Sequence, residues 1–272
     1  MSVNGQSRST ARILALANQK GGVGKTTTAI NLGTGLAQAG KKCVIIDLDP
    51  QGNASTGLGF RTEDRLQTTY DALGGSTPLV QVLSPTTIEG LSIAPASVDL
   101  SGIDVELVDD PQRARKLKTL IDDPAGQMTS RFDYILIDCP PSLNLLTINA
   151  MAAADGILVP LQCEFFALEG LTQLIGTVQR VQGALNPGLR ISGIILTMYD
   201  QRNRLSSQVA DDVRENLGDI VFSTLIPRNV RLSEAPSFGL PVMAYDADCA
   251  GSLAYKALTK ELLSRDSETL AA

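Results

Sequence analysis

The chain has 272 residues, of which 43% are apolar, so it can bury a substantial core, and one α/β domain is expected. Its formal net charge of −6 excludes a protein coated in positive charge for nucleic acid, so any DNA binding must come from a local patch. Without any histidine it lacks the commonest metal ligand and general base, and it has no apolar run long enough to span a membrane.

Apolar runs of strand length alternate with helix-like stretches along the whole chain. Such alternation predicts a single doubly wound, mostly parallel α/β sheet flanked by helices, the P-loop NTPase arrangement. We expect one domain over residues 11–265, a disordered head at 1–10, short helices and loops at 61–95, and a frayed tail at 266–272. The expected strands are 13–17, 43–47, 91–94, 134–138, 156–160, 191–198 and 221–226, and the expected helices lie near 26–38, 105–121, 143–153, 168–183, 206–217 and 251–264.

A phosphate-binding loop, Lys-Gly-Gly-Val-Gly-Lys-Thr at residues 20–26, lies between the first expected strand and the first expected helix. Its glycines allow backbone amides to wrap phosphates, Lys25 would reach the outer phosphates, and Thr26 would bind magnesium through its hydroxyl. Lys20 is not required by its own loop and would point away from its own nucleotide, so its natural target is a phosphate held by another subunit. The predicted nucleotide-binding residues here are Lys20, Gly21, Gly22, Val23, Gly24, Lys25, Thr26 and Thr27.

Three aspartates follow expected strands close to this loop. Asp138 closes the run Tyr-Ile-Leu-Ile, and Asp47 and Asp49 lie two residues apart at the end of the second strand, so both would point to one side. Acids at such strand ends beside a phosphate loop handle magnesium and the attacking water. The alternative for any one of them is a helix cap or a turn.

Five segments, in the same order along the chain, resemble the ParA/Soj partition ATPases of the deviant Walker-A, MinD-like class. The resemblance extends from about Arg12 to about Leu263. It implies ATP and Mg²⁺ as cofactors and a slow, partner-stimulated hydrolysis of ATP to ADP and phosphate. The segments are NQKGGVGKTTTAIN at 18–31, DLDPQGNASTGLG at 47–59, IDCPPS at 137–142, QCEFFALEG at 162–170 and IPRNVRLSEAPSFG at 226–239.

The resemblance also implies roles for individual residues. Asp49 would orient or activate the attacking water, while Lys25 and Lys20, one from each subunit, would share the developing charge. Magnesium would be held by Thr26, Asp47 and Asp138, with Asp138 as the Walker-B acid. Pro227 and Asn229, with Arg228 between them, resemble the adenine-side segment of the family, although Ile-Pro-Arg-Asn could equally be a strand-ending turn.

Two arginine pairs follow successive expected strands: Arg202 with Arg204, and Arg228 with Arg231. Because loops after successive parallel strands emerge at one edge of a sheet, the two pairs can converge. The resemblance implies that Arg202 and Arg231 contact double-stranded DNA without reading its sequence, and an ATP-dependent homodimer would double the patch. The alternative is solvated loop arginines, or ion pairs with Asp200, Asp211 or Glu234.

Three other classes compete with a DNA-segregation ATPase. A MinD-like membrane-cycling ATPase needs a basic amphipathic tail, whereas residues 261–272 carry three acids and one arginine. A redox ATPase like the nitrogenase iron protein needs two cysteines that converge, whereas Cys139 directly follows Asp138 and is better read as core. A metabolic ligase on the same fold would need a substrate-pocket signature, which we do not find. We therefore expect a cytoplasmic, nucleoid-associated ATPase that is released from DNA by a ParB-type centromere-binding partner and does not bind membranes.

Overall fold

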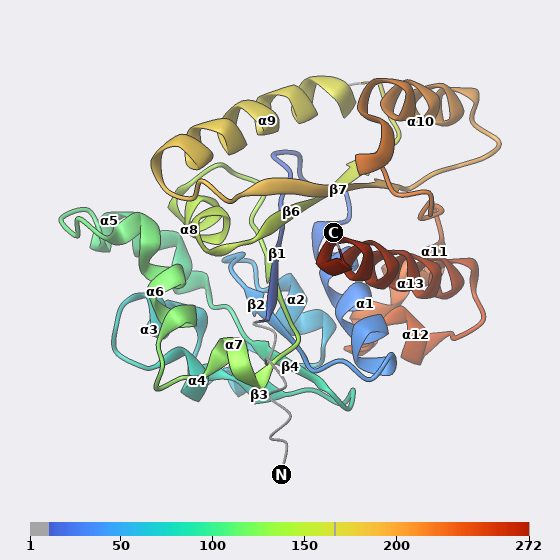
Figure 1. Cartoon of the computed structure of the whole chain (residues 1–272). Helices are drawn as coiled ribbons and strands as arrows, with labels where there is room; N and C mark the ends of the chain where they lie inside the picture. Colours follow the sequence, from blue (N-terminus) through green and yellow to red (C-terminus); the bar gives the residue numbers. More distant parts are fainter. Residues whose placement is uncertain (1–10, 166, 272) are drawn as a thin grey trace, which may run out of the picture.

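The computed structural model describes residues 11–165 and 167–271, which fold around one mixed sheet (Figure 1). Its seven strands have the order β3-β4-β2-β5-β1-β6-β7, and every pairing is parallel except the short antiparallel β3–β4 contact. The predicted α/β class is confirmed. The strands are β1 (Arg12–Leu16), β2 (Cys43–Asp47), β3 (Ser84–Pro85), β4 (Leu91–Ala94), β5 (Tyr134–Asp138), β6 (Gly156–Gln162) and β7 (Arg190–Thr197).

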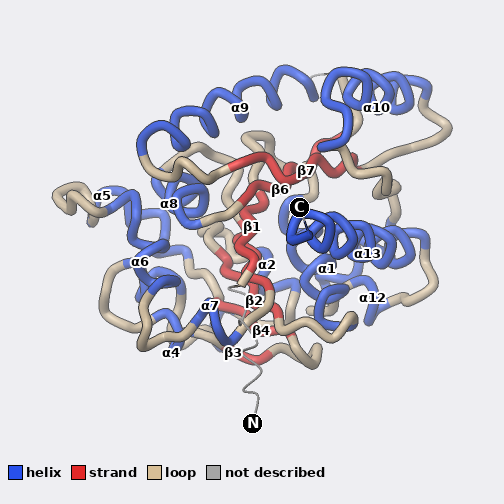
Figure 2. Tube along the Cα trace, viewed as in Figure 1, coloured by secondary structure: helices blue, strands red, loops and turns tan. Residues whose placement is uncertain are grey.

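Helices cover both faces of the sheet (Figures 1 and 2). Within the described residues, none of them is long and apolar enough to cross a membrane. The α-helices are α1 (Lys25–Gln38), α2 (Asn53–Gly57), α3 (Thr69–Leu73), α4 (Leu79–Val82), α5 (Ile103–Glu106), α6 (Lys116–Asp122), α7 (Met128–Arg131), α8 (Leu145–Ala153), α9 (Ala167–Ala184), α10 (Arg204–Leu217), α11 (Val230–Glu234), α12 (Val242–Tyr245) and α13 (Ala250–Ala271). The 3-10 turns are η1 (Thr62–Asp64), η2 (Val98–Gly102), η3 (Arg113–Arg115), η4 (Gly218–Ile220) and η5 (Ala235–Phe238).

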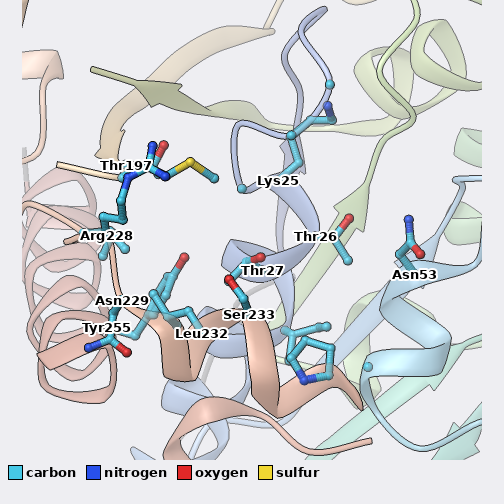
Figure 3. A pocket seen from close by; sticks show the side chains of 18 of the residues that line it. Lys25, Thr26, Thr27, Asn53, Thr197, Arg228, Asn229, Leu232, Ser233 and Tyr255 are labelled. Atoms are coloured by element: carbon cyan, nitrogen blue, oxygen red, sulfur yellow. The ribbon is translucent and has the colours of Figure 1, made fainter. Parts of the chain in front are cut away.

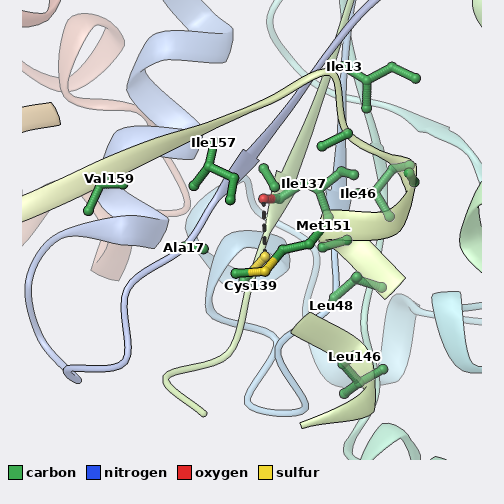
Figure 4. Packing of buried hydrophobic residues seen from close by; sticks show 14 of the residues in the cluster. Ile13, Ala17, Ile46, Leu48, Ile137, Cys139, Leu146, Met151, Ile157 and Val159 are labelled. Carbon is green, nitrogen blue, oxygen red and sulfur yellow. Dashed lines mark hydrogen bonds between the residues drawn. The ribbon is translucent and has the colours of Figure 1, made fainter. Parts of the chain in front are cut away.

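The core has two layers because successive side chains of a strand point to opposite faces. In β1, Leu14 and Leu16 belong to the layer beneath α1 and α13, whereas Ile13 and Ala15 belong to the layer beneath α6, α8 and α9. Figure 4 shows this second layer around Cys139, whose thiol donates to the Ile137 carbonyl at 3.8 Å. Burial raises the pKa of the Cys139 thiol, so this cysteine is an inert core residue.

The expected long helix at 105–121 is wrong. The chain forms the short α5, then an extended turn and η3, and only then α6. Pro111 lies in the middle of this stretch, and a proline disfavours helical backbone at the preceding residue.

The expected strand at 221–226 is also wrong, although the segment does run beside β7. Its pairings with β7 and with the residue after that strand are isolated bridges, Val221 with Ile194 and Pro227 with Tyr199. The reason is Glu261 on α13, whose carboxylate accepts hydrogen bonds from the backbone N–H groups of Ser223 and Thr224 at 2.7 and 2.9 Å. A carboxylate thereby takes the donors that a regular strand would give to its neighbour.

The carboxyl-terminal helix is longer than expected and continues to Ala271, through most of the segment that we expected to fray. Asp266 anchors it, because its carboxylate pairs with Arg12 at 3.4 Å and accepts a hydrogen bond from the Tyr134 hydroxyl at 2.9 Å. The expected disordered head, residues 1–10, lies outside the described residues.

Candidate functional site

A cavity of about 560 Å³ opens at the carboxyl edge of the sheet, where the phosphate loop follows β1 (Figure 3). In a doubly wound sheet, ligands bind at this edge, where the strand order reverses on either side of the first strand. Three separate segments form most of its walls: the phosphate loop with the start of α1, the stretch from Asp49 to Gly57, and residues 226–236. The rest of the lining comes from Pro141, Thr197, Met198 and Tyr255. The structure thus brings together the phosphate loop, Asp49 and the Pro227–Asn229 segment, all of which were predicted from the sequence.

The phosphate loop depends on glycine at two positions with left-handed backbone, Gly22 at φ 74° and Gly24 at φ 91°. Gly24 caps α1, whose first turn carries no acidic residue, so its N–H groups and positive dipole end are available to an anion. The Thr197 hydroxyl, at the end of β7, donates to the Val23 carbonyl at 2.8 Å. The loop is therefore held in an open, phosphate-binding shape by the neighbouring strand.

The two lysines of the loop lie in different surroundings. Lys25 is buried, and its ammonium donates to the Lys20 carbonyl at 3.0 Å. Burial lowers the pKa of Lys25, and the nearby Asp138 and Asp49 carboxylates oppose this shift. The half-exposed side chain of Lys20 pairs with Glu164 and does not line the cavity. This orientation agrees with a lysine that does not serve its own nucleotide, but its action in trans stays a prediction.

Asp47 and Asp138 are register partners on the neighbouring strands β2 and β5, and both are fully buried. Burial raises the pKa of Asp47 to about 6, although hydrogen bonds from Ser55 and Asp49 oppose the shift. Burial raises the pKa of Asp138 as well, with the charge of Asp47 as the next cause, while Thr26 beside it acts in the opposite direction. The charge of Asp47 therefore destabilises the ionised form of Asp138.

Their hydrogen bonding separates the roles of these two aspartates. The Asp47 carboxylate accepts three hydrogen bonds, from the Ser55 N–H and hydroxyl at 2.9 and 2.6 Å and from the Asp49 N–H at 3.1 Å. By distance and angle, neither carboxylate oxygen of Asp138 has a hydrogen-bond partner among the described residues, although the Thr26 hydroxyl is close enough to lower its pKa. A buried carboxylate without donors, beside a threonine hydroxyl, fits a magnesium ion as the missing partner. Thr26 and Asp138 thus fit the predicted metal site, and a contribution from Asp47 stays a prediction.

Magnesium does not need a larger cage of protein ligands here. It usually keeps several waters and takes further oxygens from substrate phosphates. The described residues contain no group of three or more His, Cys, Asp or Glu side chains that could hold a metal ion. The donor set at this site suits an ion delivered with a nucleotide.

Asp49 and the adenine-side segment both line the cavity. Asp49 is 7% exposed, and one of its carboxylate oxygens accepts the Gln51 N–H at 3.0 Å. The side-chain oxygen of Asn229 caps α11 by accepting the Arg231 N–H at 2.9 Å. The amide N–H₂ of Asn229 remains a donor that could meet a base, and the role of this residue at adenine stays a prediction.

Sequence reasoning missed several residues that line the cavity. Tyr255 comes from α13, and its buried hydroxyl shares a hydrogen bond of 3.0 Å with Thr28. Met198 directly follows β7 and has the unusual φ of 51°, which costs a non-glycine residue about 1 kcal/mol or more. Neither residue belongs to a motif, and contacts of this kind between distant parts of the chain leave no local signal.

The backbones of the two arginine loops do converge, as predicted. Tyr199 forms a parallel bridge with Pro227, and the Arg228 N–H donates to the Tyr199 carbonyl at 2.9 Å. In this state, however, Arg202 pairs with Asp200 through two hydrogen bonds of 3.0 and 3.1 Å, and Arg231 pairs with Glu234 and Asp246. The ion pairs that we weighed as the alternative are therefore present, although the arginines stay on the surface. Arg204 begins α10, and Arg228 lines the cavity.

Known proteins resemble this chain over nearly its whole length. A family model described as an AAA domain matches residues 11–191. The chromosome partitioning protein ParA of Caulobacter vibrioides is 58% identical over 255 residues, covering 94% of this chain and 95% of the relative. The chromosome-partitioning ATPase Soj of Treponema pallidum is 52% identical, covering 94% and 99%. Among solved structures, cobyrinic acid a,c-diamide synthase from Mycobacterium smegmatis with a bound ATP analogue and magnesium is 33% identical, with a TM-score of 0.82 and coverage of 93% and 94%.

Proposed function

The chain belongs to the ParA/Soj family of chromosome-partitioning ATPases, and we propose that ATP switches it between a free state and a DNA-bound dimer. It is an ATPase that uses ATP and Mg²⁺. The observation that carries the proposal is the cavity at the carboxyl edge, where a deviant phosphate loop, a strand-end aspartate and the segment after residue 226 meet.

Hydrolysis at this site is mainly a matter of positioning and charge. The amides of Gly21, Gly22 and Gly24 and the amino end of α1 hold the phosphates, and Lys25 neutralises the outermost one. Asp49 orients the water that attacks the terminal phosphate, because the protein has no histidine and Asp49 is the carboxylate that lines the cavity. Bound magnesium, held by Thr26 and Asp138, would neutralise charge that develops on the phosphate oxygens.

Lys20 supplies the second positive charge in trans. Its side chain is paired with Glu164 outside its own cavity, while its backbone N–H donates to the Asn18 side-chain oxygen at 3.1 Å. The main chain of Lys20 is thus fixed, and its ammonium is left at the surface, where a second subunit can receive it. Each subunit of an ATP-bound homodimer then completes the other's site, as an arginine finger does.

DNA binding follows from dimerisation. The loops that carry Arg202 and Arg231 lie side by side in one protomer, and a two-fold axis presents them twice. In the monomer, acids pair with both arginines, and these exposed pairs are weak enough for phosphates to replace the acids. A ParB-type partner that stimulates hydrolysis would release the dimer from the DNA.

The competing classes have less support. Relatives that are 58% and 52% identical carry names for chromosome partitioning, whereas the ligase-like structure is 33% identical. Cys139, which a shared iron–sulfur cluster would need near the surface, is 1% exposed and packs within the core. The carboxyl-terminal helix carries Asp266 in an ion pair with the body of the protein, which does not suit a membrane anchor.

Substitution of the leading lysine tests the proposal. Lys20→Ala should leave binding of a non-hydrolysable ATP analogue intact, and should lower DNA-stimulated hydrolysis by about a thousandfold or more, the order expected for a charge supplied in trans. Lys42→Ala, an exposed lysine before β2, is the matched control. Unchanged turnover in Lys20→Ala, or a wild-type protein that stays monomeric with the saturating analogue, would refute the switch.

A further inference from the structure

Arg65 is placed to organise one wall of the nucleotide cavity, although it belongs to none of the motifs discussed above. It follows η1, and its guanidinium donates to four different groups. The acceptors are the Phe60 carbonyl at 2.9 and 3.2 Å, the Ala96 carbonyl at 3.0 Å, the Gly52 carbonyl at 3.2 Å and the Thr56 hydroxyl at 2.7 Å. Gly52 and Thr56 belong to the segment that follows Asp49.

All of these acceptors are uncharged. Among the described residues, no carboxylate forms an ion pair with Arg65, and burial lowers the pKa of its guanidinium, although the more distant charges of Asp47 and Glu63 oppose this shift. A charged group that is partly desolvated without a counter-ion is costly unless its donors are well used. The planar fork of an arginine can reach several carbonyls at once, whereas a lysine ammonium cannot reproduce that geometry.

Gly52 is shaped to accept this contact. It has left-handed backbone, with φ 60°, and a Cβ at this position would lie 2.2 Å from Nη1 of Arg65. A glycine is therefore required for two separate reasons, the turn and the space for the guanidinium. Gly52 also closes the turn that carries Asp49, because its N–H donates to the Asp49 carbonyl at 2.8 Å.

The contacts of Arg65 close a ring of hydrogen bonds around this wall. The Asp47 carboxylate accepts the Ser55 hydroxyl, and the same hydroxyl accepts the Ala96 N–H at 3.0 Å. Arg65 donates to the Ala96 carbonyl and to Gly52, which leads back to Asp49, and the Asp49 N–H donates to Asp47 at 3.1 Å. The ring ties the ends of β2 and β4 to the turn of Asp49. Arg65 lies outside the sheet, and it links the residue after β4, Ala96, to the Asp49 turn at Gly52.

We propose that Arg65 is a positioning residue for hydrolysis, which holds the Asp49 turn and α2 in the geometry that aligns the attacking water. The inference rests on the proposed function, because it takes Asp49 as the residue that orients water. Arg65 itself does not line the cavity, so its effect passes through Gly52 and Thr56. A small displacement of such a group is enough to slow a reaction strongly, by about a hundredfold for roughly 1 Å.

The test uses Arg65→Lys in the full-length protein. This substitution keeps the positive charge and removes the planar guanidinium that donates to several carbonyls at once. We expect kcat for DNA-stimulated ATP hydrolysis to fall about tenfold or more, while KM and the affinity for a non-hydrolysable ATP analogue change less than about twofold. In an Asp49→Asn background, the same change should reduce the residual rate less than about twofold, because both substitutions act on one function. Arg61→Lys, an exposed arginine of the same segment, is the matched control and should have wild-type kinetics.

Each contrary outcome has its own meaning. Wild-type kcat in Arg65→Lys would overturn the inference while leaving the proposed function intact. A parallel loss of kcat, analogue affinity and thermal stability would also overturn it, because Arg65 would then only support the fold. Full additivity with Asp49→Asn would show that the residue does not act through Asp49. If the wild-type protein itself failed to hydrolyse ATP with DNA present, the proposed function would fail first.

Discussion

Asp138→Asn should make the nucleotide-free protein more stable while it destroys the magnesium site. In the wild type, Asp138 lies next to Asp47 in strand register, and both are fully buried. At the roughly 5 Å between neighbouring strands, two unit charges repel by about 3 kcal/mol if the effective dielectric constant is about 20. The asparagine removes this repulsion, so we expect a gain of about 2 to 3 kcal/mol at pH 8.

The gain should depend on pH in a definite direction. Burial raises the pKa of Asp47 to about 6 from an ordinary 3.8, and it raises the pKa of Asp138 as well. Over this window the folded state binds more protons than the unfolded state, so the wild type loses stability as the pH rises. The loss begins at about pH 4, where these carboxyls ionise in the unfolded chain, and it continues as the pH rises through the raised folded-state pKa values. The advantage of Asp138→Asn should therefore be smaller at pH 5 than at pH 8.

The assay is thermal unfolding in a chelator without nucleotide, at pH 5 and pH 8. A gain of about 2 to 3 kcal/mol corresponds to a midpoint higher by roughly 5 to 10 °C at pH 8 for a chain of this size. Added Mg²⁺ and ATP analogue should then stabilise the wild type and have much less effect on Asp138→Asn. Asp212→Asn, an exposed aspartate of α10, is the control. A variant no more stable than the wild type at pH 8, or a gain equal at both pH values, would refute the reasoning.

Two further predictions concern the switch. Asp49→Ala should bind ATP, fail to hydrolyse it and stay on DNA as a trapped dimer. The measurement is the rate at which the variant dissociates from immobilised DNA in the presence of ATP. Rapid release without ATP hydrolysis would contradict the proposed switch. Arg202→Glu or Arg231→Glu should abolish DNA retention and leave ATP binding intact, with Arg190→Glu, exposed at the opposite edge, as the control. If each wild-type protomer neutralises about two phosphates, log affinity should fall with log salt at a slope of roughly −3.6, and a slope near zero would exclude an arginine patch.

Local patterns explain why so much of the sheet could be predicted. The runs of β2, β4 and β5 coincide with the predicted strands residue for residue, because a strand buried on both faces is almost continuously apolar. The polar exceptions are Ser92 within β4 and the aspartates that close β2 and β5. The phosphate loop was equally visible, since its glycines, lysine and threonine are adjacent in the chain. Its place between β1 and α1 followed from the same periodicity.

Contacts between distant residues explain what could not be predicted. The segment after η4 looks like a strand, but the N–H groups of Ser223 and Thr224 donate to Glu261, almost forty residues later in the chain. Arg65 gives no sign in the sequence that its guanidinium reaches Gly52 and Ala96. The spacing of Arg202 and Asp200 allowed an ion pair to be predicted as one alternative. The sequence could not decide whether Arg202 would form this pair or extend into solvent.

The tie between Arg12 and Asp266 has a practical consequence for handling the protein. It brings the first described strand and the last turns of α13 together at the amino ends of the strands, across the sheet from the nucleotide cavity. Because neighbouring ends tolerate a covalent connection, a circular permutant joined here should keep its fold. New termini could then be opened at exposed surface loops, where an attached fluorophore would report whether the proposed dimer forms.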